Sequence, residues 1–98
     1  MVEWKTALVT ITGTTLYTVN AFPSLVAEVY VNRGSNGNRI KLFDGTSQKH
    51  EIPANSTDGN VYAFGGEDGV RYETSLIVDP NSSTGEIVVH YKDLERDN

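Results

Sequence analysis

The sequence contains no cysteine, and this absence excludes two kinds of small domain. Without thiols the chain can form neither a disulfide framework nor a zinc site with thiolate ligands. A domain of this length buries only about 60–65% of the surface that its unfolded chain exposes, so we expect modest stability. The fold must therefore depend on its hydrophobic core, on partner subunits, or on both.

Positive charge is also scarce, since 8 Lys and Arg residues face 13 Asp and Glu residues, for a net charge of −5. An acidic surface repels phosphate backbones and the basic residues are scattered, so we expect no binding to nucleic acid. No apolar run approaches the roughly 18 residues of a spanning helix, and residues 1–5 lack a signal-peptide pattern. The sequence thus predicts a soluble product of the cytoplasm, or of an assembly built there, with no membrane partner.

What the sequence does contain is a period-two alternation of apolar and polar residues, with no long segment of helical period. The clearest example is residues 25–32, where the apolar side chains at positions 25, 27, 29 and 31 share one face. A loop that contains Asn36-Gly37 follows, and a second alternating run covers residues 39–43. Two such runs around an Asn-Gly loop predict a β-hairpin.

Other short strands are expected along the rest of the chain, with turn signals between them: residues 4–12, 16–20, 49–53, 60–64, 70–78 and 86–92. Strands at spacings of roughly 8–14 residues predict an all-β fold, an antiparallel β-sandwich of the jelly-roll or Ig-like type with seven to eight strands. Residues 1–98 form a single domain, with 1–5 as an N-terminal arm and 93–98 as a mobile charged tail. The expected core consists of Trp4 or Ala7 together with Leu8, Leu16, Val29, Val31, Ile40, Leu42, Tyr72, Leu76, Ile87 and Val89.

Groups suited to catalysis are few. His50 and His90 are the only histidines, and no serine stands in a Gly-x-Ser-x-Gly elbow. His90 alternates with apolar neighbours and is expected on an exposed strand face, while His50 precedes Glu51 within the expected edge strand at residues 49–53. The acidic candidates for paired-carboxylate chemistry all fall in turns: Asp44, Asp58, Glu67, Asp68 and Asp79. Glycine or proline follows each of these aspartates, which explains them as turn formers, and we expect no enzyme and no cofactor.

Calcium is the metal that loop carboxylates would suit. Residues 65–69 are rich in glycine and acid and lie near Glu73 in the sequence. The Asp-x-Asp-x-Asp-Gly spacing that would supply convergent ligands is missing, so the turn interpretation is favoured and no metal site is expected.

Several aromatic residues are candidates for contact with a partner. Tyr17 and Tyr30 fall on the strand faces opposite the expected core, where a ring could stack on a sugar or enter a protein interface. Trp4 could fill the core or anchor an arm on a neighbouring molecule. The candidate interface residues are Trp4, Tyr17, Tyr30, Arg33 and Asn36.

One segment carries a family resemblance. The strand and glycine-rich loop that end in Ile40-Lys41-Leu42-Phe43-Asp44-Gly45-Thr46-Ser47 resemble the "Val-x-Leu-Tyr-Asp-Gly-Thr-Ser" pattern of small β-sandwich structural proteins of tailed bacteriophages. Residues 72–78 and 86–91 resemble the closing pair of strands of those proteins. The resemblance covers about two-thirds of the chain, from Val26 to Tyr91, and the longer acidic loop at 55–69 departs from it.

The resemblance implies a virion structural protein, foremost a capsid decoration (cement) protein that docks on the lattice of the major capsid protein and stabilises it. It implies self-association, for example as a homotrimer, and a place on the capsid surface after assembly in the host cytoplasm. It supplies no catalytic, cofactor-binding or metal-binding residue. The alternative function is a tail or head-fibre accessory module that binds host-surface carbohydrate.

Overall fold

A computed structural model of the chain describes residues 3–64 and 69–94, and at positions 35 and 36 it describes the backbone alone. The described residues form strands and loops, and none of them belongs to a helix that could cross a membrane. The strands are β1 (Trp4–Ile11), β2 (Tyr17–Asn20), β3 (Ser24–Asn36), β4 (Ile40–Asp44), β5 (Ser47–Ile52), β6 (Val61–Ala63), β7 (Val70–Tyr72), β8 (Leu76–Asp79) and β9 (Thr84–Asp93).

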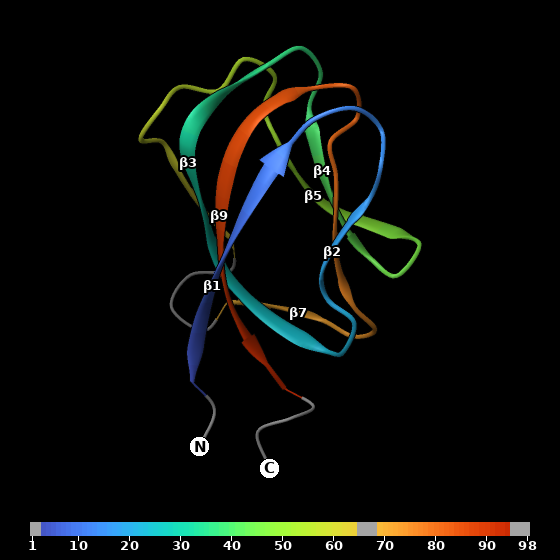
Figure 1. Cartoon of the computed structure of the whole chain (residues 1–98). Helices are drawn as coiled ribbons and strands as arrows, with labels where there is room; N and C mark the ends of the chain where they lie inside the picture. The colour runs from blue at the N-terminus through green and yellow to red at the C-terminus, as the bar shows by residue number, and fades with distance from the viewer. Residues whose placement is uncertain (1–2, 65–68, 95–98) are drawn as a thin grey trace.

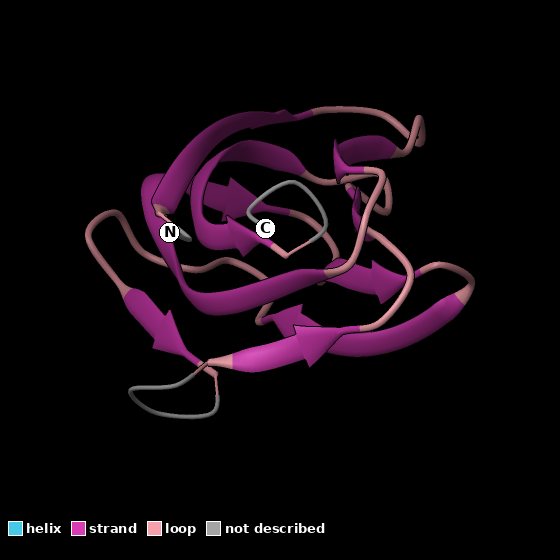
Figure 2. Cartoon of the chain, turned by 90° about the horizontal axis from the view of Figure 1, so that it is seen from below, coloured by secondary structure: helices cyan, strands magenta, loops and turns pink. Residues whose placement is uncertain are grey.

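These strands form two antiparallel sheets that pack against each other (Figure 1). Sheet A has the order β1-β9-β3-β6, and β7 pairs with another part of β3. Sheet B has the order β2-β8-β4-β5. Figure 2, the view from below, shows strands joined by loops in both layers. The antiparallel β-sandwich predicted from the alternation is confirmed.

The core lies between the two sheets. It consists of the fully buried residues Val9, Ile11, Val26, Val29, Val31, Ile40, Leu42, Ile52, Tyr72, Leu76, Val78, Ile87 and Val89. Most of the expected core is confirmed, in particular the positions on β4, β8 and β9. On β4 and β9 the confirmed core residues stand two positions apart and share one face, while Phe43 and Val88 belong to the opposite set.

Strand β1 turns a different face to the core than expected. Leu8 is 56% exposed, whereas its neighbours Val9 and Ile11 are buried. Trp4, at the start of β1, and Leu16, just before β2, are exposed as well. The predicted core positions Leu8, Leu16 and Trp4 are therefore wrong. Both alternating sets of β1 contain apolar side chains, so alternation could not decide between them. The register with β9 decides, because it places Val9 opposite the buried Ile87.

Strand β3 contains a bulge that changes its face. The register with β9 shifts between Val26 and Glu28, so Ala27 is an extra residue in the strand. As a result Val26 is buried together with the odd-numbered positions 29 and 31, while Leu25 and Ala27 are only half-buried. The prediction that positions 25 and 27 share the core face is wrong, because a single inserted residue reverses a period-two pattern.

The predicted hairpin between residues 25–32 and 39–43 is also wrong. Strand β3 lies in sheet A and β4 in sheet B, so the loop between them carries the chain from one sheet to the other. The loop is held by the β8–β9 connection, since the Asn38 side chain donates to the Asn81 carbonyl at 2.9 Å and the Ser83 hydroxyl donates to the Asn38 carbonyl. The true hairpin is β4–β5, whose turn contains Gly45 with a φ of 60°.

Residues 70–78 form two strands in place of the single expected strand, which raises the count in the described residues to nine. Strand β7 belongs to sheet A and β8 to sheet B. Between them, the backbone N–H groups of residues 73–75 donate to the carboxylate of Asp44 and not to a strand ladder. The Asp44 carboxylate thus binds the segment in which the chain passes from sheet A to sheet B.

Described residues close to both chain ends take part in strand pairing. Trp4 and Lys5 pair with β9, so the predicted arm at residues 1–5 is wrong for these two residues. Asp93 is buried and pairs with Ser24, and the backbone N–H of Leu94 donates to the Pro23 carbonyl at 2.9 Å. The predicted tail is therefore wrong for residues 93 and 94, which the long pairing of β9 with β3 holds in place. Residues 1–2 and 95–98 lie outside the described residues.

Candidate functional site

Large apolar side chains are exposed on the outer face of sheet A. Leu8 on β1, Tyr30 on β3 and Val61 on β6 are 56%, 40% and 51% exposed. Val88 on β9 also points outward, because both its neighbours along the strand are fully buried. These side chains come from four different strands and from distant parts of the chain.

The four residues lie in one line across the sheet. The register pairs Leu8 with Val88, Val88 with Tyr30, and Tyr30 with Val61. Directly opposite residues have Cβ atoms about 4.5–5.5 Å apart, so these side chains are immediate neighbours. We call them the apolar stripe. Single exposed apolar residues are ordinary on a protein surface, but a contiguous patch marks a place of interaction.

A row of polar side chains lies on each side of the apolar stripe, two positions away along β1 and β9. On β3 Glu28 is two positions from Tyr30 and Arg33 is three, because the register with β9 shifts between Val31 and Arg33. One row contains Thr6, His90 and Glu28, and the other contains Thr10, Glu86 and Arg33. In the first row His90 Nδ1 lies 3.5 Å from Glu28 Oε1. In the second row the Glu86 carboxylate accepts a hydrogen bond from Asn32, and the Arg33 guanidinium donates to the Gly85 carbonyl at 3.1 Å. The stripe thus has the polar rim that protein interfaces usually have.

Trp4 extends this surface toward the start of β1. Trp4 is 36% exposed, and the centroid of its ring lies 4.9 Å from that of His90. The ammonium group of Lys92 lies 4.4 Å from the centre of the indole, which is a cation–π arrangement. Trp4 is therefore part of the outer face of sheet A.

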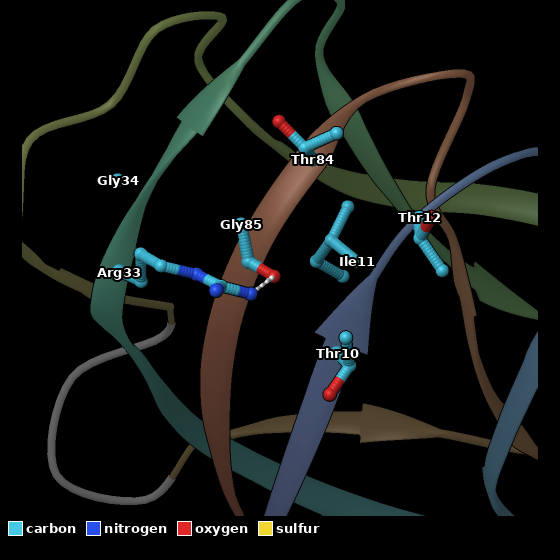
Figure 3. A pocket seen from close by; sticks show the side chains of 7 residues that line it. All are labelled: Thr10, Ile11, Thr12, Arg33, Gly34, Thr84 and Gly85. Carbon is cyan, nitrogen blue, oxygen red and sulfur yellow. Dashed lines mark hydrogen bonds between the residues drawn. The ribbon is translucent and has the colours of Figure 1, made fainter.

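A shallow hollow of about 470 Å³ lies at the other end of the same sheet (Figure 3). It is lined by Thr10, Ile11, Thr12, Arg33, Gly34, Thr84 and Gly85. Figure 3 shows Arg33 reaching from β3 toward β9, where it bonds to Gly85. Hydroxyl groups and one guanidinium can bind a partner, but the lining holds no nucleophile beside a base, which covalent catalysis requires.

The sequence candidates fall into two groups. Trp4, Tyr30 and Arg33 all lie on the outer face of sheet A, with Trp4 near one end of the sheet and Arg33 near the other. Tyr17 lies on β2 of sheet B and is 44% exposed, so the two tyrosines do not form one joint platform. Asn36 ends β3 and its backbone pairs with Thr84, while its side chain lies outside the described part of the chain.

Sequence reasoning missed Leu8, Val61 and Val88 as surface residues. The inward set Ile87, Val89 and Tyr91 already implies that Val88 points outward. The position of Leu8 depends on the register of β1, and that of Val61 on the pairing of β6 with β3. Strand pairing between distant segments therefore creates the stripe.

A hydrogen bond between two side chains joins sheet B to sheet A. His50 on β5 of sheet B and Tyr72 on β7 of sheet A are hydrogen-bonded through Nδ1 and the phenol, at 2.9 Å. The His50 ring also stacks on Phe64, with centroids 4.2 Å apart. Burial and the nearby Lys49 charge lower the pKa of His50, and burial together with Asp44 raises the pKa of Tyr72. The neutral pair satisfies the polar end of a buried tyrosine, as a structural contact would.

Asp44 is the other buried anchor in this region. Burial acts to raise its pKa, but the N–H groups of residues 73–75 and the charge of Lys49 outweigh burial and hold the pKa below its usual range. Lys49 Nζ lies 4.0 Å from Asp44 Oδ2. Asp44 stands at the β4–β5 turn, as predicted, and in addition fastens the distant turn between β7 and β8.

No group of three or more His, Asp and Glu side chains within residues 3–64 and 69–94 could hold a metal ion. Two of the acidic residues considered from the sequence, Glu67 and Asp68, lie outside the described residues.

Comparison with known proteins adds no relative: no family model, no curated protein and no solved structure matches this chain. The outer surface of sheet A is the feature of this structure that bears most directly on function.

Proposed function

We propose that this protein is a structural module of a multicopy protein shell, a capsid decoration protein of the tailed-phage type, and that it acts by contact and not by catalysis. The observation that carries the proposal is the apolar stripe on the outer face of sheet A. Contiguous exposed apolar area marks a protein interaction site. Covering such a stripe with protein removes it from water, which stabilises the assembly.

The residue types on this face support the proposal. Trp, Tyr and Arg are enriched at the energetic centres of protein interfaces, and Trp4, Tyr30 and Arg33 share the face. Tyr30 stands inside the stripe, between Val88 and Val61. An aromatic side chain there can bury much area on docking and lose little conformational freedom.

The rigidity of the sandwich supports it as well. The buried core and the His50–Tyr72 bond tie the two sheets together, so the outer face is formed before a partner arrives. A surface that is already ordered binds with a smaller entropic cost. The absence of cysteine suits assembly in a reducing cytoplasm, and the net charge of −5 helps to keep many copies soluble. The proposed partners are the major capsid protein and other copies of this chain, on the surface of the virion.

The test compares particles of the phage that encodes the chain, assembled with and without it. We expect particles that lack the protein to have lower mass and to release their contents at a lower temperature. Supplying the Tyr30→Ser variant should restore these properties poorly. The matched control is Tyr17→Ser, since Tyr17 is 44% exposed against 40% for Tyr30 but lies on sheet B. Particles of unchanged mass and heat stability would contradict the proposal.

A further inference from the structure

The charged residues beside the apolar stripe form an alternating square. On β9, His90 and Glu86 lie on opposite sides of the stripe, and on β3 Glu28 and Arg33 do the same. Glu28 is opposite His90, and Arg33 is opposite Glu86. The two acids therefore occupy one diagonal of the square, while Arg33 and the protonatable imidazole of His90 occupy the other.

A square of this kind is complementary to itself. When two copies face each other about a two-fold axis that runs along the stripe, Glu28 faces Arg33 of the second copy and His90 faces Glu86. When the axis runs along the strands, His90 faces Glu28 of the second copy and Glu86 faces Arg33. In both arrangements each carboxylate of one copy meets Arg33 or His90 of the other, and no carboxylate meets a carboxylate, which favours the correct partner and register.

The apolar stripe satisfies the same symmetry. It crosses the sheet in a single line, so a two-fold axis along or across that line lays the stripe of one copy on the stripe of the other. Two-fold interfaces need such a self-complementary patch, and two-fold dimers are the commonest homo-oligomers. Outer sheet faces can also pack in an aligned manner, as the two sheets inside a sandwich do.

We propose that the outer face of sheet A binds the same face of a second copy of this chain about a two-fold axis. The inference rests on the proposed function, in which this face is a contact surface, and it names the occupant of that face. The molecule measures 39 × 25 × 18 Å. Its broad side has room for the roughly 800 Å² that each partner contributes to an interface of standard size.

The association can be measured by sedimentation of the full-length protein over a series of concentrations. We expect a reversible monomer–dimer equilibrium. Leu8→Glu places a charge inside the stripe and should weaken dimerisation at least roughly ten-fold, as loss of an interface anchor does. The matched control is Leu16→Glu, because Leu8 and Leu16 are both 56% exposed but Leu16 lies next to β2 of sheet B. The control should dimerise like the unaltered chain.

A second pair of variants tests the charges. Arg33→Glu places a like charge opposite an acid of the second copy in either arrangement, so it should weaken the dimer more than the neutral Arg33→Gln. Circular dichroism of each variant checks that the fold is intact. Equal dimerisation of the two Arg33 variants would contradict the charge complementarity.

Three results would overturn the inference: a monomer at every concentration, a trimer, or equal effects of Leu8→Glu and Leu16→Glu. The two sets of experiments distinguish failure of the two-fold pairing from failure of the proposed function. If Tyr30→Ser fails to restore particles while the chain sediments as a monomer, the contact surface stands and the two-fold pairing fails. If the chain dimerises through the stripe while particles are unchanged without it, the pairing stands and the role in a shell fails.

Discussion

The carboxylate of Asp44 supplies the hydrogen-bond acceptors for the distant turn between β7 and β8, where no strand ladder does so. It ends β4 at the start of its own hairpin and accepts the backbone N–H groups of residues 73–75, at 2.8 to 3.4 Å. Hydrogen bonds to an ionised acceptor are stronger than bonds between neutral groups. At the scale of single residues, this side chain should therefore contribute more to stability than its place in a turn suggests.

Asp44→Ala should destabilise the fold by about 2 kcal/mol or more, because it leaves several backbone donors without their charged acceptor. Asp44→Asn keeps an oxygen in place and should cost less. The control is Asp58→Ala, which removes a carboxylate bonded to the N–H of Gly34 at an exposed site. Urea unfolding measures all three, and an equal loss for Asp44→Ala and Asp58→Ala would contradict the role of Asp44.

At the scale of elements, the register of a strand decides which side chains are buried. Strand β1 carries Leu8 and Ile11 on opposite faces, one exposed and the other 1% exposed. In β3 the bulge at Ala27 decides which side chains point to the core, so that Val26 before it and Val29 after it are both buried. Substitution by alanine should therefore change the free energy of unfolding by different amounts at two apolar residues of the same strand.

Ile11→Ala should cost about 2–5 kcal/mol, since it removes buried methyl groups and leaves a cavity. Leu8→Ala should change stability by no more than about 0.5 kcal/mol, as is usual for exposed positions. The free energies of unfolding from urea titrations test this contrast. Similar losses for the two variants would show that β1 does not have the register described above.

Gly69 allows the start of β7 to approach the bulge of β3. A Cβ at this position would lie 2.7 Å from the Val26 carbonyl oxygen, and the φ of Gly69 is 77°. Gly13 also has a positive φ, of 65°, but a Cβ there would meet no atom within 4 Å. Gly69→Ala combines strain with a backbone clash, and Gly13→Ala has strain alone. We expect Gly69→Ala to be the more destabilising by about 1–3 kcal/mol; thermal unfolding of the two variants would decide.

At the scale of the whole molecule, the contact of His50 with Tyr72 holds one sheet to the other. Burial and Lys49 lower the pKa of His50 in the folded protein. The unfolded chain then takes up the proton at higher pH than the folded one does, so stability must fall as pH falls. The loss begins near the ordinary histidine pKa of about 6.5 and is complete below the folded value.

The protein should accordingly be more stable to urea at pH 8 than at pH 5. His50→Gln should flatten this dependence between the two pH values, although it lowers stability overall. A further decrease is expected in acid below the ordinary range of aspartate, because the pKa of Asp44 is lowered and its folded-state bonds favour the charged form. An unchanged pH dependence in His50→Gln would contradict the assignment to His50.

The sequence by itself determined the fold class and most of the core. Alternation places Ile40 and Leu42, or Ile87 and Val89, on one shared face, and burial of that face needs no knowledge of distant strands. The turn role of Asp44 was visible from Asp44-Gly45 in the same way. These features depend on neighbours along the chain.

Tertiary structure alone decided which strands pair. The Asn36-Gly37 loop is as suitable for a crossing between sheets as for a hairpin, and the bonds from Asn38 to the β8–β9 connection decided for the crossing. The apolar stripe likewise exists only because the strands of sheet A align Leu8, Tyr30 and Val61 with Val88. A period of two tells which side chains share a face, but register between distant segments is a property of the packed sheet.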